Sequence, residues 1–364
     1  MLKIEKKDDY EYDLISLGEV MLRMDPVESR VRCAREFKVY EGGGEYNVAR
    51  SLRKCFRMKT AVITSLVNND VGLLIEDLMC QGGVDTSMVC WIGNTLNDKY
   101  VRNGLNFTER GFGIRGALGI SDRKYTAASM IKPDTFDWET IFRDHKIRWF
   151  HTGGIFAALS PDTSDTVIRA VRCAKKHGIP VSYDLNYRPS LWNDNGGMEH
   201  AHEVNGKIAR YVDVIIGNEE DYSACLGFET GDSSGNYDNL DINDYCKMVE
   251  RVSKKYENLE LIATTLRTVK SASLNDWTAL AYYDNKIYKA KDYYNLEILD
   301  RVGGGDSFAA GLVYGLLSDK GVQYALECGT SHGVLAMTTP GDASMASVDE
   351  VEKLMHGGGA RIKR

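Results

Sequence analysis

The sequence predicts an α/β fold: a doubly wound, mostly parallel sheet with helices on both faces and a small β-sheet lid. Two observations predict the main sheet. Apolar runs of strand length alternate with helical patterns along most of the 364 residues, and polar or glycine-rich loops follow several of these runs. Strands of a parallel sheet are buried on both faces, which explains continuous apolar runs. Such sheets bind ligands at the carboxyl ends of their strands, so functional residues are expected in those loops.

The elements follow in chain order. The expected strands share unbroken apolar character and lie at 12–22, 60–67, 147–155, 179–186, 212–220 and 259–267. The expected helices share a 3.6-residue apolar period and lie at 45–55, 70–83, 160–178, 244–255, 306–317 and 322–337. Alternating residues around Asp284-Asn285 predict a hairpin over 278–293.

Two segments break this alternation, 23–40 and 97–128. Both are polar, alternating and dotted with glycine. We expect short strands from the two segments to pair into a second, smaller sheet over the strand ends, a lid; two long surface loops are the alternative. The chain is then one domain over 12–351 with a flexible tail at 352–364.

The bulk composition excludes several classes of function. Apolar residues make up 43% and charged residues 27%, which is ordinary for a soluble globular protein. A net charge of −7 without a long basic run argues against nucleic-acid or anionic-membrane partners. The amino-terminal residues lack a signal-like apolar core, and the eight cysteines are scattered without a CxxC pair. Reduced thiols and a cytoplasmic location are expected.

The most informative stretch is "DRVGGGDSFAAGLVYGLL", Asp300 to Leu317. The glycines Gly303, Gly304 and Gly305 precede a helical pattern, which places free N–H groups and the positive end of the helix dipole at that point. The natural ligand of such a site is an anion. Asp306 follows directly and could take a proton from a hydroxyl that approaches the same anion. A simple turn is the alternative for each glycine cluster in this sequence.

Three further polar loops follow predicted strands, at 41–47, 184–192 and 217–221. In a phosphoryl-transfer enzyme, Asn218 and Asp221 could hold a hydrated Mg²⁺, and Arg188 offers a forked donor for carboxylate or phosphate. A helix cap and a surface ion pair are the respective alternatives. No GxxxxGK[ST] loop is present, and no GxGxxG follows the first strand, so P-loop and dinucleotide-binding enzymes are disfavoured.

These residues resemble a known family. "DRVGGGDSFAAGLVYGL" is similar to the carboxyl-terminal signature of ribokinase-like, PfkB-type carbohydrate kinases, and "EGGGEYNVARSLRK" to their amino-terminal signature. Within the family, "GEVMLRM", "DLNYRPSLW", "IGNEED" and "TTPGD" look most like 2-keto-3-deoxygluconate kinases. Arg301, where the family usually has threonine, and Gly304, where it has alanine, depart from the pattern.

The resemblance implies roles for individual residues. Asp306 would be the general base, and Gly303, Gly304 and Gly305 the anion hole. The residues expected to bind the sugar are Gly43, Asn47, Asn106, Arg123, Arg188, Asp306 and Asp342. Those expected to bind the nucleotide are Asn186, Arg188, Asn218, Thr265, Arg267, Gly303, Gly305 and Thr330. Asn218 and Asp221 would bind the metal through water.

The resemblance also implies substrates and cofactors: ATP, Mg²⁺, and a sugar acid phosphorylated on its terminal hydroxyl. Arginines on both the lid and the core side favour an acidic sugar over a neutral one. A neutral-sugar kinase and a non-catalytic sugar-binding sensor remain alternatives. Activation by a monovalent cation such as K⁺ stays open because its ligands in relatives are mainly backbone oxygens. A homodimer or higher oligomer is expected through the lid.

Overall fold

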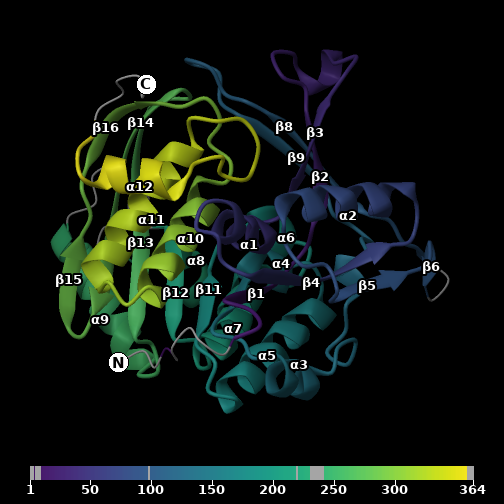
Figure 1. The fold of residues 1–364 in the computed structure, drawn as a ribbon, viewed down its shortest axis with the longest axis horizontal. Helices are drawn as coiled ribbons and strands as arrows, with labels where there is room; N and C mark the ends of the chain where they lie inside the picture. Colours follow the sequence, from purple (N-terminus) through teal and green to yellow (C-terminus); the bar gives the residue numbers. More distant parts are fainter. Residues whose placement is uncertain (1–3, 5–9, 97–98, 219, 230–241, 359–364) are drawn as a thin grey trace.

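The computed structural model describes residues 4, 10–96, 99–218, 220–229 and 242–358. It contains one large sheet flanked by helices and a smaller four-stranded sheet that projects from one end (Figure 1). The sequence-based α/β fold is therefore confirmed. Residues 97–98 of the expected lid and 359–364 of the expected tail lie outside the described residues.

The large sheet has the strand order β15-β14-β13-β12-β11-β10-β1-β4-β5, with β16 paired to β14. Its parallel strands are β1 (Leu14–Leu17), β4 (Thr60–Val67), β5 (Val89–Ile92), β10 (Phe150–Gly153), β11 (Val181–Asp184), β12 (Val214–Asn218) and β13 (Leu261–Ser271). Chain order runs outward in both directions from β1, as a doubly wound sheet requires.

The far edge of the sheet is antiparallel, formed by β14 (Leu274–Tyr283), β15 (Lys286–Lys289) and β16 (Tyr293–Glu297). The predicted hairpin is confirmed at Asp284 and Asn285. Both residues have positive φ, 50° and 58°, which is the backbone twist of a two-residue hairpin turn.

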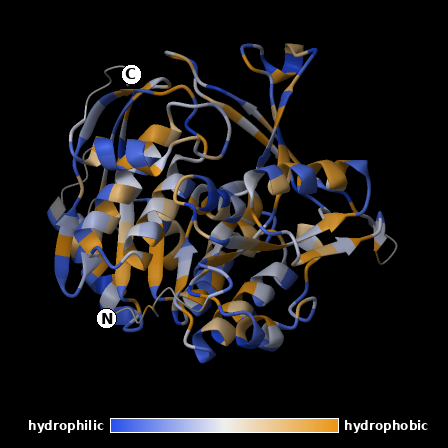
Figure 2. Cartoon of the chain, in the orientation of Figure 1, coloured by the Kyte–Doolittle hydropathy of each residue, from blue (hydrophilic) through white to orange (hydrophobic). Residues whose placement is uncertain are grey.

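Helices cover both faces of the large sheet and bury two apolar cores. One core joins the sheet to the helices α1 (Gly44–Lys54), α2 (Asp70–Gly82), α10 (Gly304–Leu317), α11 (Val322–Ala336) and α12 (Val348–Met355). The other joins it to α3 (Trp138–Asp144), α5 (Pro161–Lys176), α7 (Gly197–Ala209), α8 (Asp221–Leu226) and α9 (Ile242–Lys255). The apolar central strands stand out between the helices in Figure 2.

Alternation along single strands divides the side chains between the two cores. On β1, Leu14 belongs to one core, whereas Ile15 and Leu17 belong to the other. Short helices α4 (Gly154–Ala157) and α6 (Pro189–Trp192) follow β10 and β11, and a two-stranded ribbon joins β6 (Thr95–Leu96) to β7 (Lys99–Tyr100).

The small sheet is built from both segments that break the alternation. Its strands are β2 (Met21–Asp25), β3 (Lys38–Gly42), β8 (Gly104–Glu109) and β9 (Leu118–Asp122), in the order β3-β2-β8-β9. Strand β2 pairs with β8 across a long sequence separation, and Arg23 stands opposite Asn106. The prediction of a second sheet is confirmed; two separate loops are excluded.

Some predicted boundaries were wrong. The strand expected at 12–22 is two strands, β1 and β2, because the chain leaves one sheet for the other after Leu17. The segment expected as a tail at 352–364 overlaps α12, which starts after the capping box at Ser347 and ends at Met355. No helix among the described residues combines the length and the apolarity that crossing a bilayer would need.

Candidate active site

The amino terminus of α10 forms an open backbone site. Gly303 precedes the helix with φ 78°, and a side-chain carbon there would overlap the backbone oxygen of Asp342. No side chain caps the helix, so the N–H groups of its first turn keep their bonding capacity. Gly305 is exposed, and nothing lies within 4 Å of the place where its side chain would be. Gly303 and Gly304 are buried next to Asp342 and Met337, so it is Gly305 that leaves the helix end open to an anion.

Asp306 lies in the first turn of α10 and is partly exposed. Its Oδ2 accepts a hydrogen bond of 2.7 Å from Nδ2 of Asn47. Burial of the carboxyl group raises the pKa of Asp306 to about 6, aided by the charge of Asp342 and opposed by Asn47 and Arg188. A carboxyl group with this pKa is largely ionised at neutral pH and still basic enough to accept a proton.

A second helix end faces the first. Helix α1 begins after Gly43, whose close approach to the backbone oxygen of Glu19 leaves no room for a side chain. A Cβ atom placed on Gly44 would lie 3.6 Å from Oδ1 of Asp306 and 3.8 Å from Nδ2 of Asn186. The two signature motifs and the loop after β11 therefore meet at one place.

The side chain of Asn47 has a hydrogen-bond acceptor without a partner. Asn47 is buried, and its Oδ1 lacks a hydrogen-bond partner although its Nδ2 binds Asp306. A buried acceptor without a donor is unfavourable unless a ligand supplies one. A sugar hydroxyl is a donor of the required kind.

Arg123 is the residue of the site with the clearest capacity to bind an anion. Its side chain is only 13% exposed and stands 3.5 Å from Oε2 of Glu19. Its Nε and Nη1 nevertheless make no hydrogen bond. Glu19 is held by Thr126, whose hydroxyl donates to Oε1 at 2.7 Å. A largely buried guanidinium that lies in an ion pair with Glu19 but has two nitrogen atoms without hydrogen bonds fits a carboxylate or phosphate.

Glu45 is a buried acid between these groups. Burial raises its pKa to about 7, with a further increase from the charge of Asp306 and a decrease from Arg123. Gly18 and Gly153 both lie against its carboxylate, so side chains at these positions would displace it. The two glycines therefore leave room for the carboxylate of Glu45 near the candidate base, Asp306.

Arg188 and three acids form the other side of the site. Arg188 is exposed, and its Nη1 donates to the carbonyl oxygen of Tyr187 at 2.9 Å. Burial raises the pKa of Asp184 well above its usual range, as do the charges of Asp221 and Asp306, while Arg188 lowers it. Several carboxylates that repel one another in this way form a suitable set of oxygen donors for Mg²⁺.

Asn218 and Asp221 adopt the geometry of a helix start. Oδ1 of Asn218 accepts the N–H groups of Glu220 and Asp221, at 2.8 and 3.0 Å. The two oxygens of Asp221 accept the N–H groups of Tyr187 and Asn218, at 2.9 and 2.8 Å. Burial raises the pKa of Asp221. The backbone contacts are those of the cap alternative, and each carboxylate oxygen keeps one lone pair for a water.

The predicted nucleotide residues do not all face an opening. Arg267 on β13 is exposed. Burial lowers the pKa of Arg301, which lies two residues before Gly303, and the charge of Arg267 lowers it further. Two guanidinium groups that repel each other favour an anion between them. Thr265 is buried. Thr330 is completely buried and donates to the carbonyl oxygen of Leu326 at 2.8 Å, so it offers no surface to a nucleotide in this structure.

Asp342 belongs to a buried ionic cluster that ties the lid to α10. Arg23, on lid strand β2, is completely buried and binds Asp25, Asp300 and Asp342. Oδ1 of Asp300 accepts the N–H of Val302 at 3.2 Å, directly before the glycines. Asn106 lies in the lid, where its Nδ2 donates to Oγ1 of Thr108 at 3.0 Å.

Sequence reasoning missed four charged residues of this site. Glu19, Glu45 and Asp184 stand inside motifs that were singled out, but a single sequence does not tell which acid of a motif faces the site. Arg301 was noted only as a departure from the family pattern. The sequence did contain a signal for the role of Arg301, because an arginine two residues before a predicted anion hole is well placed to bind the same anion.

Comparison with known proteins agrees with this geometry. Residues 12–349 match the family described as pfkB family carbohydrate kinase. The chain belongs to this family. It is therefore a carbohydrate kinase, and the resemblance to PfkB-type kinases in the sequence is confirmed.

Several individual relatives cover almost the whole chain. The 2-dehydro-3-deoxygalactonokinase of Haloferax volcanii is 25% identical over 97% of this chain and 99% of its own length. The 5-dehydro-2-deoxygluconokinase of Bacillus licheniformis is 24% identical, with coverages of 97% and 99%.

Solved structures agree as well. The 2-dehydro-3-deoxygluconokinase of Thermotoga maritima superposes with a TM-score of 0.86 at 34% identity, over 94% of this chain and 99% of the other. A structure from E. coli named as a ribokinase II, with ATP and Mg²⁺ bound, has a TM-score of 0.74 at 17% identity, with coverages of 95% and 99%. The latter likeness supports the fold alone.

Proposed function

We propose that this protein transfers the γ-phosphoryl group of ATP to the terminal, C6 hydroxyl of 2-keto-3-deoxygluconate. The observation that carries the choice of an acidic sugar is the buried guanidinium of Arg123, whose Nε and Nη1 lack hydrogen-bond partners. A substrate carboxylate would satisfy them, and one such contact contributes about 1.5–3 kcal/mol. The names of the relatives from Haloferax volcanii, Bacillus licheniformis and Thermotoga maritima, which are kinases of keto-deoxy sugar acids, support the same class.

Asp306 acts as the base in this proposal. The sugar hydroxyl lies between the carboxylate and the amino terminus of α10, and Asp306 takes its proton as the oxygen attacks the γ-phosphorus. The N–H groups after Gly303 stabilise the negative charge of the transferring phosphoryl group. Asn47 keeps the carboxylate oriented through its 2.7 Å hydrogen bond. Closure of the lid excludes water, which would otherwise accept the phosphoryl group.

Mg²⁺ and ATP fit the polar side of the site. Asp184, together with Asn218 and Asp221 through water, would hold the metal ion, which neutralises phosphate charge when bound. Arg188, Arg267 and Asn186 would contact the phosphates, and Arg188 would also contact the carboxylate of the sugar acid. All eight cysteines are free thiols, which suits a reducing compartment, so we place the reaction in the cytoplasm.

The lid provides a surface for a second subunit. Exposed apolar side chains gather there at Phe112, Ile114, Leu118 and Ile120. Strand β9 is the outer strand of the small sheet, and all of its residues are exposed. Uncovered apolar edges of this kind promote pairing with another chain. We propose a homodimer formed through the lid.

One experiment tests the substrate class. ADP release is measured with 2-keto-3-deoxygluconate, 2-keto-3-deoxygalactonate, 5-keto-2-deoxygluconate, fructose and ribose. We expect kcat/KM to be about one to two decades higher for the preferred acid than for either neutral sugar. A preference for 5-keto-2-deoxygluconate would favour the activity of the Bacillus licheniformis relative. A preference for fructose or ribose would contradict the proposal, and sugar binding without ADP release would indicate a sensor.

A further inference from the structure

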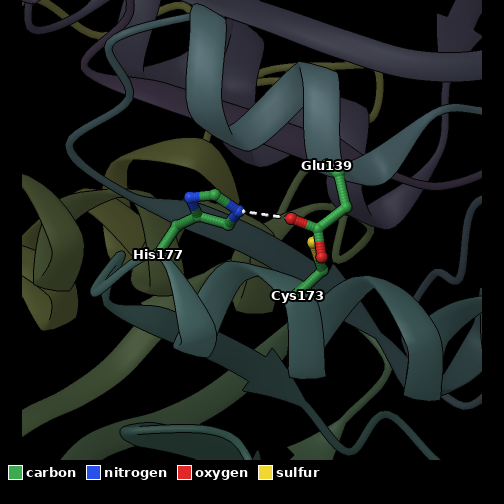
Figure 3. Close-up of side chains that lie close together, drawn as sticks. All are labelled: Glu139, Cys173 and His177. Atoms are coloured by element: carbon green, nitrogen blue, oxygen red, sulfur yellow. Dashed lines mark hydrogen bonds and ion pairs between the residues drawn. The ribbon is translucent and has the colours of Figure 1, made fainter.

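Three potential metal ligands gather between α3 and α5, away from the candidate active site. Glu139 is in the first turn of α3, Cys173 lies in the last full turn of α5, and His177 follows four residues later. Figure 3 shows the three side chains pointing toward one another. Helix α5 returns from the carboxyl end of β10 to the amino end of β11, so this cluster lies at the edge of the sheet opposite Asp306.

The distances suit a small metal ion. One ligand atom of each of the three residues lies within 4.8 Å of the others. Nε2 of His177 is 2.9 Å from Oε2 of Glu139. Around a tetrahedral zinc ion, bonds of about 2.0–2.3 Å place neighbouring ligand atoms about 3.3–3.6 Å apart. A displacement of a few tenths of an ångström would open the histidine–glutamate contact to that spacing.

The surroundings already orient the ligands. Nζ of Lys176 binds Oε1 of Glu139 at 2.7 Å, whereas Oε2 contacts Nε2 of His177. Carboxylates that bind metals are commonly held by such an outer hydrogen bond. Cys173 and His177 are four residues apart, at the end of one helix, and therefore lie on the same side. Zinc binding would release the proton of the Cys173 thiol to solvent, and the resulting thiolate and the carboxylate together match the charge of a divalent ion.

Access from solvent is also present. The side chain of Glu139 is 52% exposed, whereas Cys173 packs into the apolar core. An adjoining pocket of about 470 Å³ is lined by residues that include Asp137, Arg169 and Arg172. This pocket has room for a water molecule as a fourth ligand.

We propose that Glu139, Cys173 and His177 bind Zn²⁺, with water completing a tetrahedral site. The combination of sulfur, nitrogen and oxygen ligands selects a borderline ion of this kind rather than Mg²⁺. The ion links α3 to α5, so it stabilises the fold and takes no part in phosphoryl transfer. The arginines of the pocket could instead attract an anion, and the experiment separates the two.

The test is a titration of metal-free protein with Co²⁺, which replaces Zn²⁺ and reports sulfur ligands through a sulfur-to-metal charge-transfer band. We expect this band to saturate at one equivalent and to disappear when Zn²⁺ is added. Cys173→Ser and His177→Ala should abolish it. Cys33→Ser, which changes an exposed cysteine in the lid segment, is the matched control and should retain the band. Zn²⁺ should raise the melting temperature of the wild type but not of His177→Ala.

Results of two kinds would overturn the proposal, one spectroscopic and one thermal. One is the absence of the band in the wild type, or its persistence in Cys173→Ser. The other is a melting temperature that rises with inorganic phosphate and not with Zn²⁺, which would assign the pocket to an anion. His177→Ala changes a side chain at the end of α5 and keeps the test decisive should Cys173→Ser fail to fold. Kinase activity with Mg²⁺ should be the same in His177→Ala and the wild type.

Discussion

The hydrogen bond from Asn47 to Asp306 should set the pH at which the enzyme loses activity. The Nδ2–Oδ2 distance is 2.7 Å, and the bond partly offsets the effect of burial, so that the pKa of Asp306 is about 6 with the bond in place. A hydrogen bond to a charged group contributes about 1.5–3 kcal/mol, which corresponds to about one to two pKa units. In Asn47→Ala, the pKa of Asp306 should therefore rise to about 7–8.

The assay is the pH dependence of kcat/KM, which reports ionisations of the free enzyme. Only the ionised form of Asp306 can accept a proton, so activity falls as the pH drops below its pKa. The acidic limb should lie near pH 6 in the wild type. In Asn47→Ala the acidic limb should move to higher pH. This shift is expected even if the loss of the sugar contact made by Asn47 also lowers the maximal rate.

Asp342→Asn provides a control with the opposite sign. The charge of Asp342 raises the pKa of Asp306, so its removal should move the acidic limb to lower pH. An acidic limb that stays in place in Asn47→Ala, or that moves the same way in both variants, would refute the reasoning.

Three other predictions concern separate parts of the molecule. Arg188→Lys should raise KM for an acidic sugar by about tenfold or more and change KM for a neutral sugar much less, since lysine lacks the forked donor; equal effects in steady-state kinetics would count against a carboxylate contact. Arg23→Met should lower the free energy of unfolding in urea by about 3–5 kcal/mol, because it leaves buried carboxylates without their cation; a loss below about 1 kcal/mol would contradict a buried ionic cluster. Ile120→Asp on the exposed lid strand should convert a dimer into a monomer in light scattering, and a wild-type monomer would remove the proposed interface.

Much of the fold could be predicted because its signals are local. The apolar run 60–67 is β4 without any change of boundary, and Ser160 with Pro161 marks the start of α5. The Asp284-Asn285 turn fixes its hairpin. Helices α3 and α12 were missed, since they have only 7 and 8 residues and too few apolar positions to show a helical period.

Residues of the candidate site could be predicted where a glycine pattern marks the start of a helix. They were missed where their position in the site depends on contacts between segments far apart in the sequence. Gly303 and Asp306 are only three positions apart in sequence, so their joint role follows from local geometry. The pairing of Asn47 with Asp306 joins residues 259 positions apart. The buried Arg23 cluster likewise joins β2 to the loops before and after the last long helices, and no local pattern in "MLRMD" announces it.

The account depends most on Asp306 as the proton acceptor beside a phosphoryl group held by α10. The most direct measurement compares single-turnover ADP formation by Asp306→Asn and the wild type, together with nucleotide affinity. Asparagine preserves the shape of the side chain but cannot take the proton, so turnover should fall by about 10²–10⁴-fold while ATP binds as before. Turnover within a few-fold of the wild type would contradict the central claim.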